Sequence, residues 1–269
     1  MLKFKKMHGL GNDFVIMDGR GQDLNLTPER IARIADRQRG VGCDQFIVIE
    51  TPEAPEARAF MRIYNPDGTQ AGACGNATRC VADILMQETG EDHAVIETVS
   101  GLLSCVRAGE YLVTVDMGPP RLAWRDIPLS KECDTLHLPL EGDPVAVSMG
   151  NPHCVFFVED AENAPLEEWG PRFEKDLLFP EKTNVEFVEV KDRQHLRMRV
   201  WERGAGVTQA CGSGACAAGV AAVRRGLTDR KVAVTLDGGD LVIEWREEDG
   251  HVLMTGPYAY VFDGRLEMV

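Results

Sequence analysis

The feature of this sequence that most restricts its fold is an internal duplication with a period of half the chain. Residues 62–65 are Arg-Ile-Tyr-Asn, and 137 positions further on residues 199–202 are Arg-Val-Trp-Glu. The same step leads from residues 73–76, Ala-Cys-Gly-Asn, to residues 210–213, Ala-Cys-Gly-Ser. Solenoids and propellers repeat with much shorter periods. The long period therefore predicts two related domains, each with a cysteine at the equivalent position.

The duplication also predicts where the two domains begin and end. Gly118-Pro119 is matched by Gly256-Pro257 near the ends of the two copies. We therefore expect one domain over residues 1–117, a hinge near 117–120 and a second domain over residues 118–256. Residues 258–262 have the composition of a strand, so the tail 257–269 is expected to return to the first domain.

Composition favours a soluble protein and excludes several classes of partner. The 269 residues are 44% hydrophobic and 27% charged, which is close to the average for globular domains. A net charge of −14 argues against nucleic acid, because such binding depends on lysine and arginine. The sequence contains neither a signal-peptide pattern nor an apolar run long enough for a membrane span. We expect a cytoplasmic protein, no membrane partner and eight cysteines present as thiols.

The local patterns predict many short strands around a few helices. The expected strands, several with alternating apolar residues, are 46–50, 95–98, 111–116, 154–158, 185–190, 196–201, 232–236 and 241–245. Three helices are expected, from Thr27-Pro28 to about Arg37, over 76–88 and over 214–225. The last two follow the duplicated cysteines. The helix over 214–225 is built almost entirely of small apolar residues, and such helices are normally buried. We therefore predict an α/β protein of the α+β type, in which each lobe is a barrel-like mixed sheet wrapped around a central helix.

The position of Cys74 and Cys211 at the start of two helices indicates chemistry. The first amide groups of a helix have no internal partner, and the helix dipole adds positive potential there. We expect this environment to lower the pKa of a thiol and to hold a carboxylate. Pseudo-symmetry would place the two sulfurs on opposite sides of a cleft between the lobes. One thiolate could then remove a proton from a carbon while the opposing thiol returns one, which inverts the stereocentre.

Simpler interpretations are favoured for the other cysteines. A lone cysteine is most often a small buried hydrophobic residue, and we expect this of Cys80, Cys105, Cys133 and Cys216. Cys43 and Cys154 flank candidate site residues and fit either role. The spacings contain no paired C-x₂-C motifs, so no metal site is expected.

Several motifs taken together resemble the diaminopimelate epimerase family over nearly the full length. In the first half they are residues 6–14 (KMHGLGNDF), 40–45 (GVGCDQ), 65–68 (NPDG) and 74–76 (CGN). In the second half they are residues 150–153 (GNPH), 183–185 (TNV), 201–206 (WERGAG) and 208–216 (TQACGSGAC).

The resemblance implies an epimerase without a cofactor that interconverts LL- and meso-diaminopimelate, a small-molecule substrate on the route to lysine and peptidoglycan. It also implies a homodimer. Cys74 and Cys211 resemble the acid–base pair, and His153 and Glu202 resemble neighbours that tune the thiols or hold the substrate amine. The residues that resemble the remaining substrate contacts are Asn12, Gln45, Asn65, Gly75, Asn76, Asn151, Asn184, Arg203, Gly212 and Ser213.

Two positions depart from the family pattern, and two other functions stay open. Ala77 occupies a position where glycine is common, and Val207 one where glutamate is common, which puts fine selectivity in doubt. Relatives with the same fold racemise proline or histidine, or isomerise phenazine precursors. A non-catalytic redox or metal-binding module is the second alternative.

Overall fold

The computed structural model describes residues 1–72 and 74–267, which form a mixed α/β protein. These residues contain four helices and a large mixed sheet. Contacts divide the chain into two units. The first comprises Met1–Val115 together with Gly256–Val269, and the second comprises Asp116–Thr255.

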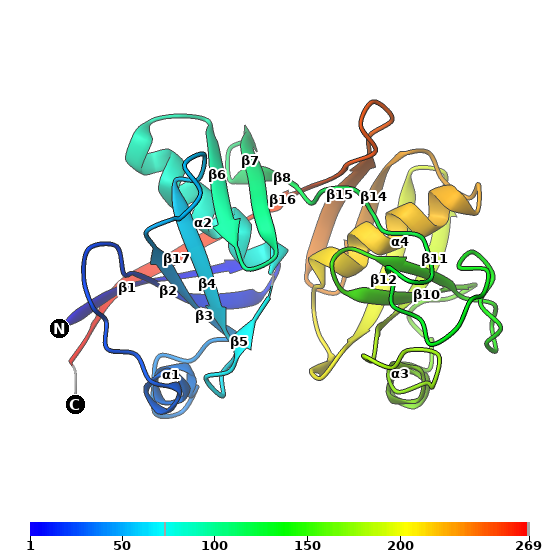
Figure 1. The fold of residues 1–269 in the computed structure, drawn as a ribbon, viewed down its shortest axis with the longest axis horizontal. Helices are drawn as coiled ribbons and strands as arrows, with labels where there is room; N and C mark the ends of the chain where they lie inside the picture. Colours follow the sequence, from blue (N-terminus) through cyan, green and yellow to red (C-terminus); the bar gives the residue numbers. More distant parts are fainter. Residues whose placement is uncertain (73, 268–269) are drawn as a thin grey trace. The chain divides into compact units, whose positions relative to one another are not determined.

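The first unit contains the helices α1 (Pro28–Ala35) and α2 (Gly75–Thr89) (Figure 1). Its strands in chain order are β1 (Leu2–Gly9), β2 (Asn12–Asp18), β3 (Gln45–Glu50), β4 (Ala59–Tyr64), β5 (Gln70–Ala71), β6 (His93–Thr98), β7 (Gly101–Gly109), β8 (Leu112–Asp116) and, from the end of the chain, β17 (Ala259–Leu266). Strand β1 pairs antiparallel with both β17 and β2. The pairs β2–β3 and β4–β6 are parallel, and β3–β4, β6–β7 and β7–β8 are antiparallel.

The second unit repeats this order element by element. Its helices are α3 (Leu166–Glu174) and α4 (Gly212–Arg224). Its strands are β9 (Val145–Ser148), β10 (Pro152–Val158), β11 (Asn184–Asp192), β12 (His195–Glu202), β13 (Gly206–Val207), β14 (Lys231–Leu236), β15 (Gly239–Trp245) and β16 (Val252–Pro257). Here too the equivalent pairs β10–β11 and β12–β14 are parallel, and their neighbours are antiparallel. The duplication in the sequence is therefore also a duplication of topology.

Helices α2 and α4 are the buried helices of their units. Helix α2 contacts β1, β2, β4, β6 and β7, and α4 contacts strands β9 to β12, β14 and β15 (Figure 1). Small residues allow this close packing. A Cβ at Gly219 of α4 would lie 2.9 Å from the side chain of Ile243 on β15. Helix α2 ends at Gly90, whose φ of 73° is the left-handed value that glycine adopts without strain.

The sequence predicted α1, α2 and α4 and missed α3. The hydroxyl of Thr27 accepts a hydrogen bond from the amide of Arg30 at 3.3 Å, as expected of an N-cap, and α1 ends two residues before Arg37. Helix α3 contains Pro171 directly after Gly170, a pair that normally interrupts a helix. Packing outweighs this local preference, because Leu166 and Phe173 of α3 are buried in an apolar cluster.

The predicted strands lie within observed strands except at two residues. Tyr111 is predicted in a strand, but it adopts a left-handed turn with φ of 57°, and β8 begins at Leu112. Tyr258 precedes β17, which begins at Ala259. Ala77 lies in the first turn of α2 and is not among the residues with positive φ, which explains why alanine is tolerated there.

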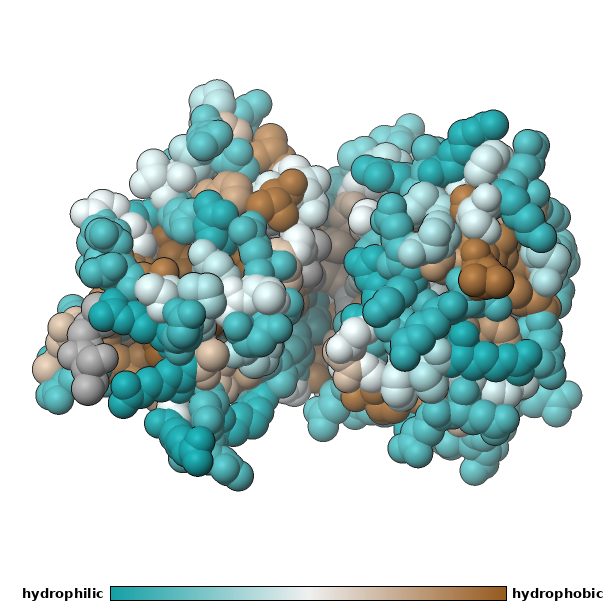
Figure 2. All heavy atoms as spheres, turned by 60° about the horizontal axis from the view of Figure 1, so that its bottom comes forward, coloured by the Kyte–Doolittle hydropathy of each residue, from teal (hydrophilic) through white to brown (hydrophobic). Residues whose placement is uncertain are grey.

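The surface agrees with the composition. The face shown in Figure 2 is mainly hydrophilic on both units, with apolar side chains in small separate patches. Within residues 1–72 and 74–267, no helix has the length and apolar character that a membrane crossing requires.

Candidate active site

Cys74 is the N-cap residue of the buried helix α2. Its backbone is extended, with φ of −154° and ψ of 102°, and its sulfur accepts a hydrogen bond from the amide of Ala77 at 3.4 Å. The hydroxyl of Thr78 donates to the Cys74 carbonyl at 2.9 Å, which fixes the cap from the other side. The thiol is half-buried. The first turn of α2 therefore directs an amide at this sulfur.

Two asparagines lie beside this thiol. The oxygen Oδ1 of Asn12 is 3.7 Å from the sulfur of Cys74 and also accepts a hydrogen bond from Nδ2 of Asn76 at 3.2 Å. Asn12 in turn donates to Asp44 at 3.1 Å. The buried Arg79 donates to Oδ1 of Asn76 at 2.9 Å, which fixes the orientation of that amide. The structure thus brings together four predicted residues of the first unit, Asn12, Cys74, Gly75 and Asn76.

Among the residues that the structure describes, no hydrogen bond joins Gln45 or Asn65 to this network. The amide nitrogen of Asn65 donates to the hydroxyl of Thr69 at 3.0 Å within a turn. The oxygen Oε1 of Gln45 is buried, and among the described residues it has no hydrogen-bond partner. A buried amide oxygen without a partner is costly, so it is a candidate to accept a hydrogen bond from a ligand.

Cys211 is the N-cap residue of α4 and repeats the geometry of Cys74. Its φ and ψ are −116° and 107°, and its sulfur accepts from the amide of Gly214 at 3.4 Å. The hydroxyl of Ser213 lies 3.6 Å from the same sulfur, and Nδ2 of Asn151 lies 3.4 Å from that hydroxyl. Cys211 is only 6% exposed, so this thiol is more deeply buried than Cys74.

The expected lowering of the thiol pKa is wrong for Cys211. Burial raises its pKa well above the ordinary value, and the carboxylates of Glu202 and Glu186 raise it further. The hydrogen bonds from Ser213 and from the Gly214 amide act in the predicted direction, but they are outweighed. In this environment Cys211 is held as a protonated thiol.

His153 stands at the centre of a series of hydrogen bonds whose inner part is fully buried. Its Nδ1 is 2.6 Å from Oε1 of Glu186, and its Nε2 is 3.1 Å from Oδ1 of Asn151. The side chains of His153 and Glu186 are both 0% exposed. Strands β10 and β11 position this pair, since His153 is the register partner of Asn184, two residues before Glu186. A further hydrogen bond joins Asn151 to Ser213, whose hydroxyl lies beside the sulfur of Cys211.

Glu202 is a second carboxyl group in this region. Burial raises its pKa, whereas hydrogen bonds to Thr208 and Cys211 and the charge of His153 lower it. The hydroxyl of Thr208 makes a short hydrogen bond to Oε1 of Glu202. Within the second unit, Glu202 thus forms a hydrogen bond with Cys211 and interacts electrostatically with His153.

Asn184 and Arg203 are positioned by backbone contacts. Asn184 is buried, accepts from the Arg203 amide at 2.9 Å and donates to the Pro152 carbonyl at 3.0 Å. The guanidinium of Arg203 is directed to the carbonyl of Glu181 at 3.1 Å. Val207, the second departure from the family pattern, is 43% exposed on β13.

Glu186 is the site residue that the sequence interpretation missed. A signal was present, because Glu186 is the one charged residue in the apolar stretch 185–188 of β11. Its second oxygen, Oε2, is buried, and no partner for it lies among the described residues. Gly214 belongs to the same arrangement. A Cβ at Gly214 would lie 2.9 Å from Oε1 of Glu186 and 3.2 Å from the sulfur of Cys211.

The remaining cysteines lie in apolar surroundings. Cys80, Cys105 and Cys216 are fully buried, and Cys133 packs against the apolar cluster beneath α3. Burial raises the pKa of Cys43 to about 11 and that of Cys154 well above its usual range. Both are members of apolar core clusters, which favours a packing role. Within the described part of the chain, no three His, Cys, Asp or Glu side chains are grouped so that they could hold a metal ion.

Comparison with known proteins identifies the family. The family model described as diaminopimelate epimerase matches residues 4–123 and 145–261. The chain belongs to the diaminopimelate epimerase family. It is 54% identical to the diaminopimelate epimerase of Rhodospirillum centenum over 98% of this chain and 92% of that protein. It is 55% identical to that of Acidiphilium cryptum over 98% of this chain and 96% of that protein.

Solved structures show that the fold is shared more widely than the sequence. A phenazine biosynthesis protein of the PhzF family from Bacillus anthracis has a TM-score of 0.71 at 18% identity, covering 99% of each chain. A hydroxyproline epimerase from Agrobacterium vitis has a TM-score of 0.68 at 15% identity, covering 98% of this chain and 91% of that one. Family membership thus makes the chain an isomerase, and the shared fold alone does not distinguish it from these relatives.

Proposed function

We propose that the protein interconverts LL- and meso-diaminopimelate by proton exchange between two cysteines. The observation that carries the proposal is the repeated cap geometry. In each unit the sulfur of the cysteine that caps the buried helix accepts the amide of the third residue beyond it, at 3.4 Å in both cases. Membership of the diaminopimelate epimerase family and identities of 54–55% supply the substrate.

The chemistry requires a base on one face of the α-carbon and an acid on the other. A thiolate removes the α-proton, the electron pair remains on the carbon, and the opposing thiol delivers its proton to the opposite face. The two sulfurs exchange protonation states in each turnover. The high pKa of Cys211 supports Cys211 as the sulfur that carries the proton when the cycle begins, and Cys74 as the base at that moment. We propose that the two lobes are pseudo-symmetric and barrel-like and that each supplies one of the two cysteines.

The carbanion needs stabilisation, and we assign this to the first turns of α2 and α4. Free amides and the positive helix end stabilise the charge that develops on the reacting carboxylate. We assign this cradle to Gly75, Asn76, Gly212 and Ser213. His153 and Glu202 hold the substrate ammonium or tune Cys211. The remaining contacts to the substrate are assigned to Asn12, Gln45, Asn65, Asn151, Asn184 and Arg203.

Glu186 is proposed as a positioning residue rather than a catalytic one. Its hydrogen bond to Nδ1 of His153 fixes the ring so that Nε2 faces Asn151. Its charge also raises the pKa of Cys211. The second effect favours a protonated thiol at Cys211 before substrate is turned over.

A homodimer in the cytoplasm is the proposed state of the protein. Strand β17 supports it, because its three consecutive residues Tyr260, Val261 and Phe262 are 49%, 50% and 44% exposed. Contiguous apolar surface often marks an interface. Light scattering coupled to gel filtration measures the oligomeric state. A monomer at micromolar concentration would contradict the dimer.

Isotope exchange tests the reaction directly. The protein is incubated with LL-diaminopimelate in deuterated water without pyridoxal phosphate, and the meso isomer and α-deuterium are measured. Both should appear, and Cys74→Ser or Cys211→Ser should reduce the rate by at least about 100-fold. Cys133→Ser, which replaces a cysteine outside the site, should leave the rate unchanged. Turnover of proline but not of diaminopimelate would assign the chain to the alternative substrate class.

A further inference from the structure

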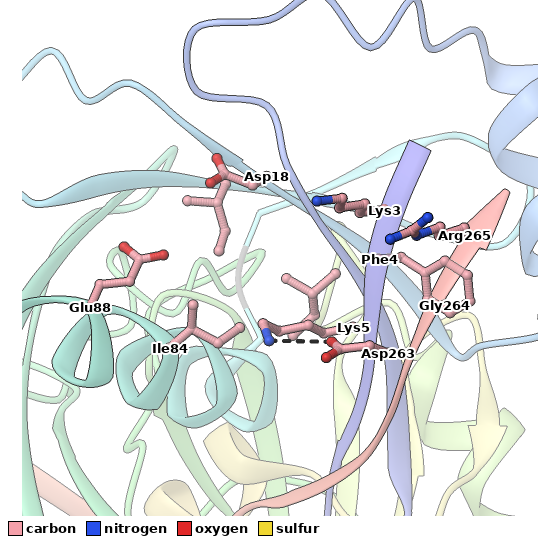
Figure 3. A pocket seen from close by; sticks show the side chains of 11 residues that line it. Lys3, Phe4, Lys5, Asp18, Ile84, Glu88, Asp263, Gly264 and Arg265 are labelled. Carbon is pink, nitrogen blue, oxygen red and sulfur yellow. Dashed lines mark hydrogen bonds and ion pairs between the residues drawn. The ribbon is translucent and has the colours of Figure 1, made fainter. Parts of the chain in front are cut away.

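The first unit contains a cavity of about 510 Å³ that none of the proposed substrate contacts lines. It lies at the C-terminal end of α2, where Ile84 and Glu88 contribute to its wall (Figure 3). Cys74 caps the other end of this helix. Glu88 is 14 residues from Cys74, which corresponds to roughly 21 Å along the helix axis at about 1.5 Å per residue. The cavity is therefore separate from the proposed site at Cys74.

Two cations stand directly opposite each other at the cavity. Lys3 on β1 is the register partner of Arg265 on β17, and both line the cavity. Figure 3 shows the two side chains on the same side of it. Like charges directly opposite in a sheet are destabilising. Within residues 1–72 and 74–267, neither Lys3 nor Arg265 forms an ion pair, although the chain carries a net charge of −14.

Each carboxylate of the same cavity already has a cationic partner. Arg20 forms ion pairs of 2.8 Å with both Asp18 and Glu88. Its hydrogen bonds are the main cause that lowers the pKa of Asp18. The third carboxylate, Asp263, accepts a hydrogen bond from Lys5 at 3.3 Å, as the dashed line in Figure 3 marks. Because one arginine pairs with two carboxylates, the group of Arg20, Asp18 and Glu88 keeps a charge of −1, so the two unpaired cations Lys3 and Arg265 leave a net charge of +1 around the cavity.

The rest of the cavity wall is apolar. Ile16, Ile49, Ile84 and the ring of Phe4 contribute to it, and each of them is at most 8% exposed. A cavity of this volume falls in the range of small-molecule sites, about 300–1,000 Å³. A ligand that fits both parts carries an anionic group beside an apolar body.

We propose that this cavity binds a small amphipathic anion, whose carboxylate lies between Lys3 and Arg265 and whose hydrocarbon part covers the isoleucine wall. This binding site is additional to the proposed epimerase function. Because Lys3 lies on β1 and Arg265 on β17, a bound anion also links the first strand to the last.

Isothermal titration calorimetry with octanoate tests the proposal. Octanoate should bind with one site per chain, and octylamine, which has the same tail and the opposite charge, should not. Affinity should rise from butanoate to hexanoate to octanoate, by about threefold to fourfold for each added methylene that is buried. The double substitution K3Q/R265Q should weaken octanoate binding by about tenfold. Both positions are exposed, so the fold should be retained.

A matched control separates this site from general charge effects. Lys231→Gln removes an exposed cation from the second unit and should leave octanoate binding unchanged. Epimerisation is measured in the same samples, and octanoate should not compete with diaminopimelate. No binding of octanoate, equal affinity for octanoate and butanoate, or unchanged binding in K3Q/R265Q would each overturn the proposal, whatever the epimerase activity. Competition with substrate would place octanoate in the epimerase site and overturn it as well.

Discussion

The buried Glu186 carboxylate should control the reactivity of Cys211, and Glu186→Gln tests this with almost no change in shape. A Cβ at Gly214 would lie 2.9 Å from Oε1 of Glu186 and 3.2 Å from the sulfur of Cys211. The two atoms are therefore no more than about 6 Å apart. At that separation, with an effective dielectric constant of about 20, a carboxylate disfavours a thiolate by about 3 kcal/mol. In bulk water the same repulsion would be only about 0.7 kcal/mol.

This repulsion should be measurable through the alkylation rate of Cys211. Removing the charge should lower the pKa of Cys211 and raise the population of its thiolate at neutral pH. Alkylation of Cys211 by iodoacetamide, followed by peptide mass spectrometry, should become about 10- to 100-fold faster in Glu186→Gln. Epimerisation should nevertheless slow, because His153 loses its anionic partner.

The control is Glu189→Gln, the same substitution three residues further along β11, where the carboxylate pairs with Lys191. It should change neither alkylation nor turnover. The reasoning would be refuted if Glu186→Gln kept a wild-type melting temperature and still showed an unchanged alkylation rate at Cys211. Equal acceleration in both variants would refute it as well.

Two further predictions concern backbone space and acid stability. Gly214→Ala should reduce kcat by at least about tenfold with unchanged circular dichroism, because the added methyl group would crowd Glu186 and Cys211. The control Gly109→Ala should leave kcat unchanged, because no atom lies nearer than 3.5 Å to the added methyl group. For Asp13, burial raises the pKa but hydrogen bonds from two cations outweigh it, so the folded pKa lies below the unfolded one. Its stabilisation is therefore complete above about pH 4 and is lost as the pH falls further. Asp13→Asn should lower the free energy of unfolding in urea more at pH 7 than at pH 3.

The sequence predicted those parts of the site that local patterns determine. The duplicated cysteines and the glycines after them placed two N-caps correctly, because a cap depends only on the first turn of its own helix. The helix expected over 76–88 ends at Thr89, before the C-cap Gly90, for the same local reason. The parallel pairing of β2 with β3 and of β10 with β11 required the structure, since it joins segments separated by a helix.

The pKa of Cys211 could not be predicted from its helix position. The amide of Gly214 acts as the sequence suggested, but burial and two carboxylates from β11 and β12 determine the sign. These carboxylates reach the thiol only through tertiary packing. Helix α3 was missed for a related reason, because the apolar cluster under Phe173 compensates for Pro171.

The return of the last strand to the first unit has a consequence for biosynthesis. The second unit is one continuous segment, whereas the first is completed by β17, which pairs with β1, and by Pro257, whose carbonyl accepts a hydrogen bond from the buried Arg79 at 3.0 Å. A ribosome therefore synthesises the whole second unit before it makes the final strand of the first. The half that is translated first is the half that finishes folding last, and until β17 has emerged the β1 edge stays open to pairing with other chains.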